Sequence, residues 1–499
     1  MGNLNTKIIY RFLGITAFLN GLFMFVAFPF SYFNNEIEKW GILNAGIITV
    51  FIGCLLYFFN KPKNTGIQKK EGYLIVTLGW LTLTLTGMLP YLLSGSIPSI
   101  TNAFFETISG YSTTGSSILT DIESMPKGIL FWRSITHWIG GMGIIVLTIA
   151  ILPLLGIGGM QLFMAEAPGP SPDKLHPRIT DTAKRLYLIY VVLTFVEFLL
   201  LKVAGMSWFD AINHAMSTVS TGGFSTKNAN MAYYNNLPFV QYIVIFFMMV
   251  AGTNFVLTYF ALKGKLRKVF QSEEFKYYLF GIIGVSIIIT IIILFFQDPN
   301  LQTTIQHPEV FGKNESAIRH ALFQVTSIIT TTGFVSADFT TWSFFATGIF
   351  FALFFTGGSA GSTSGGIKIV RHIVMLKNSF LEFKKALHPN AIIPVRYDGK
   401  TVNQTIVFNI LSFFIIYMLI FMMASVILTF LGLDFLSALG AAASSLGNIG
   451  PSIGSVSPTE SFSHLPSMAK WFCSFLMLIG RLELFTVLIL FTPFFWRKN

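Results

Sequence analysis

The sequence is poor in cysteine and in charged residues. It has two cysteines in 499 residues, Cys54 and Cys473, and both lie in apolar runs, which excludes a disulfide framework and a cysteine-based zinc site. Charged residues make up 11% of the chain, whereas soluble domains usually carry about 25%. The sequence also lacks a nucleotide-binding fingerprint and a recognisable nucleophile or metal site. These deficits exclude an ordinary soluble domain and leave little support for an enzyme.

Apolar sequence, by contrast, is abundant. Hydrophobic residues make up 53% of the chain, and several runs reach the ~20 residues that a membrane-spanning helix needs. The sequence therefore predicts an all-α polytopic membrane protein with about ten spanning helices in the lipid bilayer. The formal net charge of +11 would suggest nucleic-acid binding in a soluble protein. Here the basic residues lie in short loops between apolar runs, so they indicate membrane topology and no nucleic-acid partner.

A short strip of small, polar residues that contains a glycine near its end occurs four times. Strips 1 to 4 are residues 109–116, 216–224, 327–334 and 444–451, and their last glycines follow one another at intervals of 108, 110 and 117 residues. These anchor glycines are Gly115, Gly223, Gly333 and Gly450, and an alanine lies twelve positions before each. Four phased copies indicate fourfold internal duplication. Four strips can meet on one axis and form a ring.

Each copy is expected to comprise a helix, a short re-entrant helix, the strip and a second helix, so that four repeats surround one central pore. An N-terminal pair of transmembrane helices precedes them. We divide the chain into the helix pair (1–71) and repeats 1 to 4 (72–160, 161–270, 271–400 and 401–499). The second helices are predicted over 129–155, 240–262, 342–375 and 468–494, and only the third is expected to be broken.

Lysine and arginine gather in alternate loops, and the loops between them are acidic or nearly neutral. By the positive-inside rule both termini are expected in the cytoplasm, with the strips toward the outer half of the membrane. The re-entrant helices then point their partly negative C-terminal ends into the cavity, where they favour a cation.

The strips are candidates for a selectivity filter, because non-helical backbone at membrane depth must be buried or line a watery cavity. Their neutral oxygens suit a weakly hydrated monovalent cation, and no other metal is expected. Close helix packing is the alternative role for such small residues. The candidate ligands are Ser112, Thr113, Thr114, Gly115, Ser220, Thr221, Gly222, Gly223, Thr330, Thr331, Thr332, Gly333, Gly447, Asn448, Ile449 and Gly450.

A glycine-rich loop (356–366) interrupts the second helix of repeat 3, since five glycines in eleven positions do not remain regular helix against lipid. We predict a gate below the filter, with an unwound linker or a phosphate-binding loop as alternatives. Its candidate residues are Gly357, Gly358, Ser359, Gly361, Ser362, Thr363, Gly365 and Gly366.

Arg481 lies inside the last apolar helix, and an intramembrane arginine is costly enough to suggest a function. It is expected to face the pore and pair with the loop. The alternatives are an ion pair with Glu483 and burial between helices. Lys368 could belong to the gate or lie at the inner membrane surface, and the surface is preferred. Three residues near the re-entrant helices could suggest catalysis: Glu106 is assigned to electrostatics or packing, Asp210 to a helix cap, and His214 to no defined role.

These motifs resemble the Trk/Ktr/HKT superfamily of potassium transport proteins. The resemblance is carried by the four strips, the His-Trp-Ile-Gly-Gly-Met-Gly stretch at 137–143, the glycine-rich break and Arg481, covers residues 72–495, and is greatest to the TrkH branch because of the opening helix pair. It implies a homodimeric potassium-translocating subunit of the bacterial inner membrane. It also implies a TrkA-like cytosolic nucleotide-binding ring that moves the glycine-rich loop and Arg481 out of the pore. Potassium is the only ligand implied, with no organic cofactor on this chain.

In plant relatives a serine at the first filter glycine is associated with sodium selectivity, so the resemblance and Gly115 together favour potassium. In strip 4, Asn448 and Ile449 replace the Thr-Thr pair, which leaves coordination there open. The alternatives are a sodium or non-selective cation pore, a cation-coupled symporter with alternating access, and a membrane enzyme.

Overall fold

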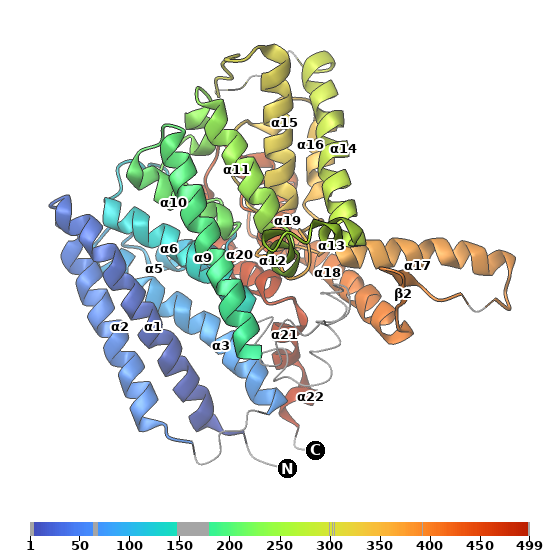
Figure 1. Cartoon of the computed structure of the whole chain (residues 1–499). Helices are drawn as coiled ribbons and strands as arrows, with labels where there is room; N and C mark the ends of the chain where they lie inside the picture. Colours follow the sequence, from blue (N-terminus) through green and yellow to red (C-terminus); the bar gives the residue numbers. More distant parts are fainter. Residues whose placement is uncertain are drawn as a thin grey trace.

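The computed structural model describes residues 4–62, 68–146 and 179–497, apart from positions 299, 302, 304 and 392. Within these ranges the protein is built from helices, with one two-stranded hairpin. The N-terminal pair consists of α1 (Thr6–Phe33) and α2 (Lys39–Phe59), which pack side by side along one flank of the molecule (Figure 1). The all-α prediction is confirmed.

In each predicted repeat a long helix is followed by a short helix, the strip and further helical segments. Repeat 1 contains α3 (Lys69–Gly87), α4 (Leu89–Leu93), α5 (Ile100–Tyr111) and α6 (Lys127–Val146). Repeat 2 contains α9 (Ile179–Val203), α10 (Trp208–Val219), η2 (Asn230–Tyr234), α11 (Pro238–Ala251), α12 (Phe255–Leu262) and α13 (Leu266–Gln271). The part of the predicted helix 129–155 that follows Val146 lies outside the described residues.

Repeats 3 and 4 follow the same plan. Repeat 3 contains α14 (Glu273–Phe295), α15 (Lys313–Ile329), η3 (Phe339–Thr341), α16 (Phe344–Leu353), α17 (Ile369–Leu387), β1 (Arg396–Tyr397) and β2 (Lys400–Thr401). The two strands are antiparallel and pair Arg396 with Thr401 and Tyr397 with Lys400. Repeat 4 contains α18 (Gln404–Phe430), α19 (Phe435–Gly447), η4 (Gly454–Val456), η5 (Phe462–His464), α20 (Ser467–Arg481), α21 (Phe485–Leu488), η6 (Ile489–Phe491) and α22 (Pro493–Trp496).

Among the described residues, six helices are long and apolar enough to cross a membrane, or eight if each of two bent helix pairs is counted as one span. Large apolar side chains stand exposed on these helices, among them Phe51 on α2, Phe280 on α14 and Phe430 on α18. Exposed apolar surface of this extent is stable only against lipid or a partner. The protein is therefore a multi-pass membrane protein.

Two predicted helices are wrong. The chain over 240–262 bends by 112° between α11 and α12, and the chain over 468–494 bends by 110° after α20. At the first bend the carbonyl of Gly252 accepts a hydrogen bond from the backbone N–H of Ser359, and the Asn254 side chain caps α12. At the second bend Glu483 and Leu484 have φ values of 57° and 52°, which end the helix. Composition did not reveal these breaks, because both segments are strongly apolar.

The short helices α5, α10, α15 and α19 lie inside the molecule and lead into the strips. Ser99, Ser207 and Asp434 cap α5, α10 and α19 by accepting a hydrogen bond from the backbone N–H three residues later. The cap of α10 is thus Ser207, and Asp210, predicted as the cap, is the residue whose N–H it binds. The last residues of each of these helices are buried, so its C-terminal end lies within the protein.

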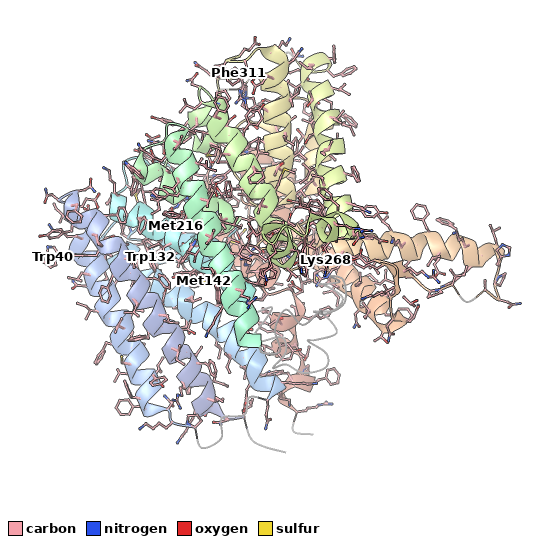
Figure 2. All side chains as sticks on the ribbon, viewed as in Figure 1. Trp40, Trp132, Met142, Met216, Lys268 and Phe311 are labelled. Atoms are coloured by element: carbon pink, nitrogen blue, oxygen red, sulfur yellow. The ribbon has the colours of Figure 1, made fainter. Side chains whose placement is uncertain are left out.

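The first turn of α1 and the C-terminal segment lie at the same end of the molecule (Figure 1). The backbone N–H of Asn5 donates to Glu71, and Lys70 donates to the Arg497 carbonyl oxygen at 3.0 Å. From the body, α17 projects sideways, and its side chains stand free along its outer half (Figure 2).

Candidate functional site

The four strips share one backbone conformation. The residue two positions before each anchor glycine lies in the left-handed region, with φ of 53° at Thr113, 54° at Thr221, 53° at Thr331 and 54° at Asn448. Left-handed backbone is rare for a β-branched residue, and its recurrence at three threonines is typical of a functional constraint. The anchor glycines also have positive φ, between 79° and 99°.

This conformation ends each short helix in the same way. The backbone N–H of the residue before the anchor glycine donates to the carbonyl of a serine five residues earlier. The donors Thr114, Gly222, Thr332 and Ile449 bind the carbonyls of Ser109, Ser217, Ser327 and Ser444 at 2.9, 2.8, 2.8 and 3.0 Å. The left-handed residue closes the helix, and the following residues leave it in extended form.

The strips form a closed ring. A Cβ placed on any anchor glycine would lie less than 3.0 Å from a carbonyl oxygen of the next strip. The pairs are Gly115 with Gly222, Gly223 with Thr332, Gly333 with Ile449, and Gly450 with Thr114. Strip 4 therefore returns to strip 1, and Asn448 also donates to the Thr114 hydroxyl at 3.0 Å. Glycine is required at each anchor both for its φ and for this approach.

The predicted filter residues are brought together by this ring. All sixteen are buried except Gly115, which is half-buried. The hydroxyls of Ser112 and Thr330 bond to Thr114 and Thr332 of their own strips, at 2.6 and 2.7 Å, and Ser220 donates to the Met216 carbonyl. These hydroxyls order the strips internally.

The glycine-rich loop lies against the ring at the helix ends of the strips. Thr363 donates its hydroxyl to the Val219 carbonyl at 3.0 Å, and the N–H of Gly365 donates to the Thr331 hydroxyl at 2.6 Å. A Cβ on Gly365 would meet the Gly447 carbonyl oxygen and the Asn448 side chain. The loop therefore touches strips 2, 3 and 4. Among the gate candidates Gly361 and Gly366 are half-buried, and the others are buried.

Arg481 completes the contact with the remaining repeat. Its guanidinium donates to the Thr363 carbonyl at 2.8 Å and to the Gly140 carbonyl of α6, in repeat 1, at 3.0 Å. The expected contact between Arg481 and the loop is present. The ion pair of Glu483 is instead made with Arg371, at 2.8 Å, so the alternative pairing with Arg481 is not formed.

Lys368 was placed wrongly by sequence. Its side chain is 5% exposed, and its ammonium donates to the Ser364 carbonyl of the glycine-rich loop. The contact was missed because α17 begins only at Ile369, which leaves the lysine at the end of the folded-back loop. Glu274 was missed as well: it accepts a hydrogen bond from the N–H of Ala360 at 2.7 Å, and a glutamate at a helix start gives no sequence signal for it.

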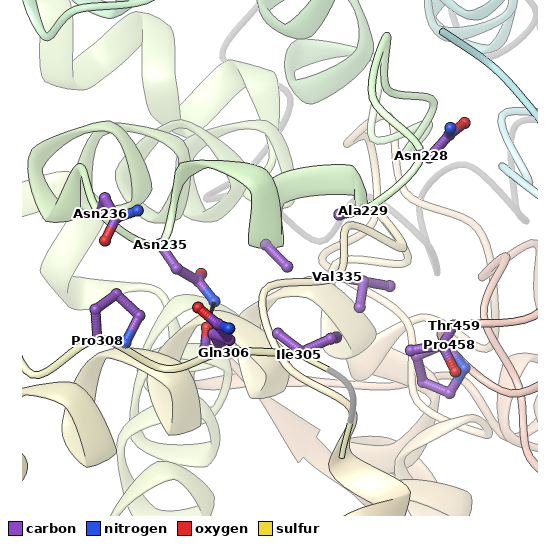
Figure 3. Close-up of a pocket in the computed structure, with 11 residues that line it drawn as sticks. Asn228, Ala229, Asn235, Asn236, Ile305, Gln306, Pro308, Val335, Pro458 and Thr459 are labelled. Carbon is purple, nitrogen blue, oxygen red and sulfur yellow. Dashed lines mark hydrogen bonds between the residues drawn. The ribbon is translucent and has the colours of Figure 1, made fainter.

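Segments that follow strips 2, 3 and 4 in the chain contribute to the lining of a hollow. This hollow has a volume of about 350 Å³ and is lined mainly by neutral polar and apolar side chains (Figure 3). Asn228 at its edge donates to Asp121 at 2.9 Å, and this hydrogen bond holds the pKa of Asp121 below its usual range. A carboxylate thus stays charged beside the hollow at neutral pH. Within the described residues no group of three or more His, Cys, Asp or Glu side chains could hold a metal ion.

Comparison with known proteins places this geometry in context. Residues 39–498 match the family model TrkH, described as a cation transport protein. The Trk system potassium uptake protein TrkH of Escherichia coli K12 is 39% identical over 90% of this chain and 91% of its own length. The protein of the same name from Halomonas elongata is 38% identical over 99% of this chain and 100% of its own. The crystal structure of the potassium transporter TrkH from Vibrio parahaemolyticus superposes with a TM-score of 0.88, 34% identity, 99% of this chain and 100% of that chain.

Proposed function

The chain belongs to the TrkH family of cation transport proteins, and from this premise we propose that it takes up potassium through a four-strip selectivity filter. Because its curated relatives are named potassium uptake proteins, its role is transport and not enzymatic catalysis. We expect it in the bacterial inner membrane, with potassium as the transported ion and no organic cofactor.

One observation carries this proposal, namely the closed ring of strips. Four backbone segments from four repeats meet in cyclic order, each glycine against a carbonyl oxygen of its neighbour. Backbone carbonyls around one axis replace the hydration shell of a potassium ion without adding a fixed charge. The uncharged lining of the hollow and the charged Asp121 beside it suit a hydrated cation that approaches the filter.

The glycine-rich loop is proposed as the gate. Together with Arg481 it contacts all four repeats at the helix end of the ring, so a permeating ion would have to pass through these contacts. The guanidinium places a positive charge there, which opposes a cation. Opening requires the loop to leave at least the Val219 and Thr331 contacts.

The inner side of the membrane is assigned to the end that carries both termini, by the positive-inside rule. We expect a cytosolic nucleotide-binding regulator, a TrkA-like ring, to act on the gate from this side. The relatives' names describe a Trk system, which agrees with a transporter that works with other components.

A homodimer is supported by α17. Four apolar side chains, Leu376, Phe380, Phe383 and Leu387, repeat at helical spacing and are 54%, 66%, 71% and 79% exposed. This stripe lies on a helix that projects from the body, and no element among the described residues covers it (Figure 2). A second copy of the chain is the occupant that we expect.

The experiment is cation flux into proteoliposomes with potassium, rubidium, sodium and lithium. In Gly115→Ser, the new side chain meets the Gly222 carbonyl oxygen in a backbone of φ 81°, and we expect relaxed selectivity. The matched control is Gly95→Ala, where φ is 73° but nothing lies within 4 Å of the added Cβ.

Gly95→Ala is expected to keep the wild-type ion preference. Sodium flux equal to potassium flux in the folded wild type would favour the non-selective pore. Proton movement in fixed ratio to potassium would favour a symporter. If the regulator is added and no cation moves, the filter assignment is wrong.

A further inference from the structure

A buried carboxylate lies behind strip 1. Glu106, nine positions before Gly115 on α5, is 0% exposed. One carboxylate oxygen accepts from the guanidinium Nε of Arg133 at 2.6 Å, and the other accepts from the backbone N–H of Ile118 at 2.9 Å. The Ser117 hydroxyl donates to the same carboxylate at 2.9 Å. Glu106 thus holds the chain that leaves strip 1 against the helix that enters it.

Arg133 extends this contact to strip 2. Its Nη1 donates to the Ser225 carbonyl at 3.0 Å, and its guanidinium lies 3.4 Å from the ring centroid of Phe224. On the same ring, His137 stacks with a centroid distance of 3.9 Å. Since Arg133 is 2% exposed, all of these contacts are shielded from water. One side chain therefore ties the exit of strip 1 to the exit of strip 2.

The other repeats carry different residues at the same two positions. The residues nine before the anchor glycine are Glu106, His214, Gln324 and Ala441, and those eighteen after it are Arg133, Gln241, Phe351 and Met468. His214 bonds to the Ser225 hydroxyl at 2.9 Å, and Gln324 donates to the Ala337 carbonyl. Only in repeat 1 are both positions charged. The ionic contact is therefore a feature of one quarter of the ring.

We infer that Glu106 and Arg133 are positioning residues for cation selectivity, which fix strips 1 and 2 at a set spacing. This inference rests on the proposed filter. To discriminate between cations of the same charge, the ligands must not move closer together around the smaller ion. A buried, charge-assisted contact restrains both strips against such a movement. Loss of the contact lets two neighbouring quarters of the ring relax.

Charge and restraint make different predictions, which a double variant separates. Glu106→Gln leaves Arg133 as an uncompensated positive charge beside the ring, so cation occupancy should fall. Arg133→Gln leaves the negative charge of the Glu106 carboxylate beside the ring, so cation occupancy of the filter should rise or stay unchanged. The double variant Glu106→Gln/Arg133→Gln restores neutrality but not the link to Ser225, so its selectivity should stay low.

The test is rubidium and sodium flux into proteoliposomes, with concentration dependence for each ion. We expect the rubidium-to-sodium flux ratio to fall about tenfold in both single variants and in the double variant. Glu106→Asp is a gentler variant that keeps the charge but is one methylene shorter. It should lower the ratio too, because it does not reach both Arg133 and Ile118. The control is Glu315→Gln, which alters a partly exposed ion pair with Arg319 within α15 and should keep the ratio.

A wild-type ratio in folded Glu106→Asp and Glu106→Gln would overturn the inference. The inference would also be overturned if the double variant had the wild-type ratio while both single variants had a lower one. Charge, and not restraint of the strips, would then set selectivity. Gly115→Ser, measured alongside, separates this failure from failure of the filter. If Gly115→Ser alters the ratio and the Glu106 variants do not, the filter stands and the positioning role falls. If none of them alters it, the proposed filter is wrong.

Discussion

Glu274 offers a direct test of the gate. Its side chain is 2% exposed, and its carboxylate accepts a hydrogen bond from the N–H of Ala360, in the glycine-rich loop, at 2.7 Å. Glu274→Ala leaves this buried N–H without an acceptor, which costs about 1–3 kcal/mol. If the bond exists only while the loop lies on the ring, the closed-to-open equilibrium shifts by about 5- to 150-fold.

The assay is radioactive rubidium uptake into proteoliposomes without a cytosolic regulator. Basal uptake by Glu274→Ala should rise by a factor in that range, and Glu274→Gln should give a smaller rise because the amide oxygen still accepts. The neighbouring Glu273 provides a control on the same helix turn. Its ion pair with Lys377 is about 30% exposed and is worth about 0–1 kcal/mol, so Glu273→Gln should change uptake little.

Two results would refute this reasoning. Unchanged uptake in folded Glu274→Ala would show that the loop keeps its place without the bond, or that the loop is no barrier. An equal rise in Glu273→Gln would show that the effect comes from charge at the start of α14 and not from the Ala360 contact. Thermal unfolding in detergent establishes that each variant is folded.

Three further predictions follow from other parts of the molecule. Arg481→Gln should raise basal rubidium uptake by roughly tenfold or more, because charge-assisted hydrogen bonds to two repeats are lost, each worth about 1.5–3 kcal/mol. Uptake equal to that of the wild type would contradict a role of Arg481 in closing the pore. Burial, and then the charge of Arg319, lowers the pKa of His307 to about 4. The unfolded chain protonates this imidazole below about pH 6.5, so the free energy of unfolding should fall as pH drops from about 6.5 to 4. The fall should be smaller in His307→Asn. Equal pH profiles of the two proteins in thermal unfolding would contradict this prediction. Phe383→Glu should shift the protein from dimer to monomer in light scattering, and an unchanged mass would remove the α17 stripe from the proposed interface.

Much of the fold could be predicted from residue patterns. The four anchor glycines and the alanines before them identified the repeats and the ring, because a strip that needs positive φ and close backbone approach tolerates little but glycine. The glycine-rich loop was located because its composition is incompatible with helix. Arg481 was identified because an arginine is rare in an apolar helix.

Other features could not be predicted, because they depend on contacts between distant segments. The bend after α11 occurs where Ser359 of the loop donates a hydrogen bond to the Gly252 carbonyl. The composition of an apolar run is the same whether the helix is straight or bent. Lys368 was placed at the membrane surface because lysine is usually solvated, yet the loop supplies it with a buried carbonyl. An ion pair between Arg481 and Glu483 was only the alternative to the loop contact, and tertiary packing brought Arg371 to Glu483 instead.

The sequence by itself determined which backbone segments can line a pore, since local conformation there depends on residue types within a few positions. Only the tertiary structure decided how these segments are held. The link from Glu106 through Arg133 to Ser225 joins residues of two repeats that are about a hundred positions apart in the chain. A single sequence shows two charged residues in apolar surroundings, but burial and distance are set by the packing of whole helices.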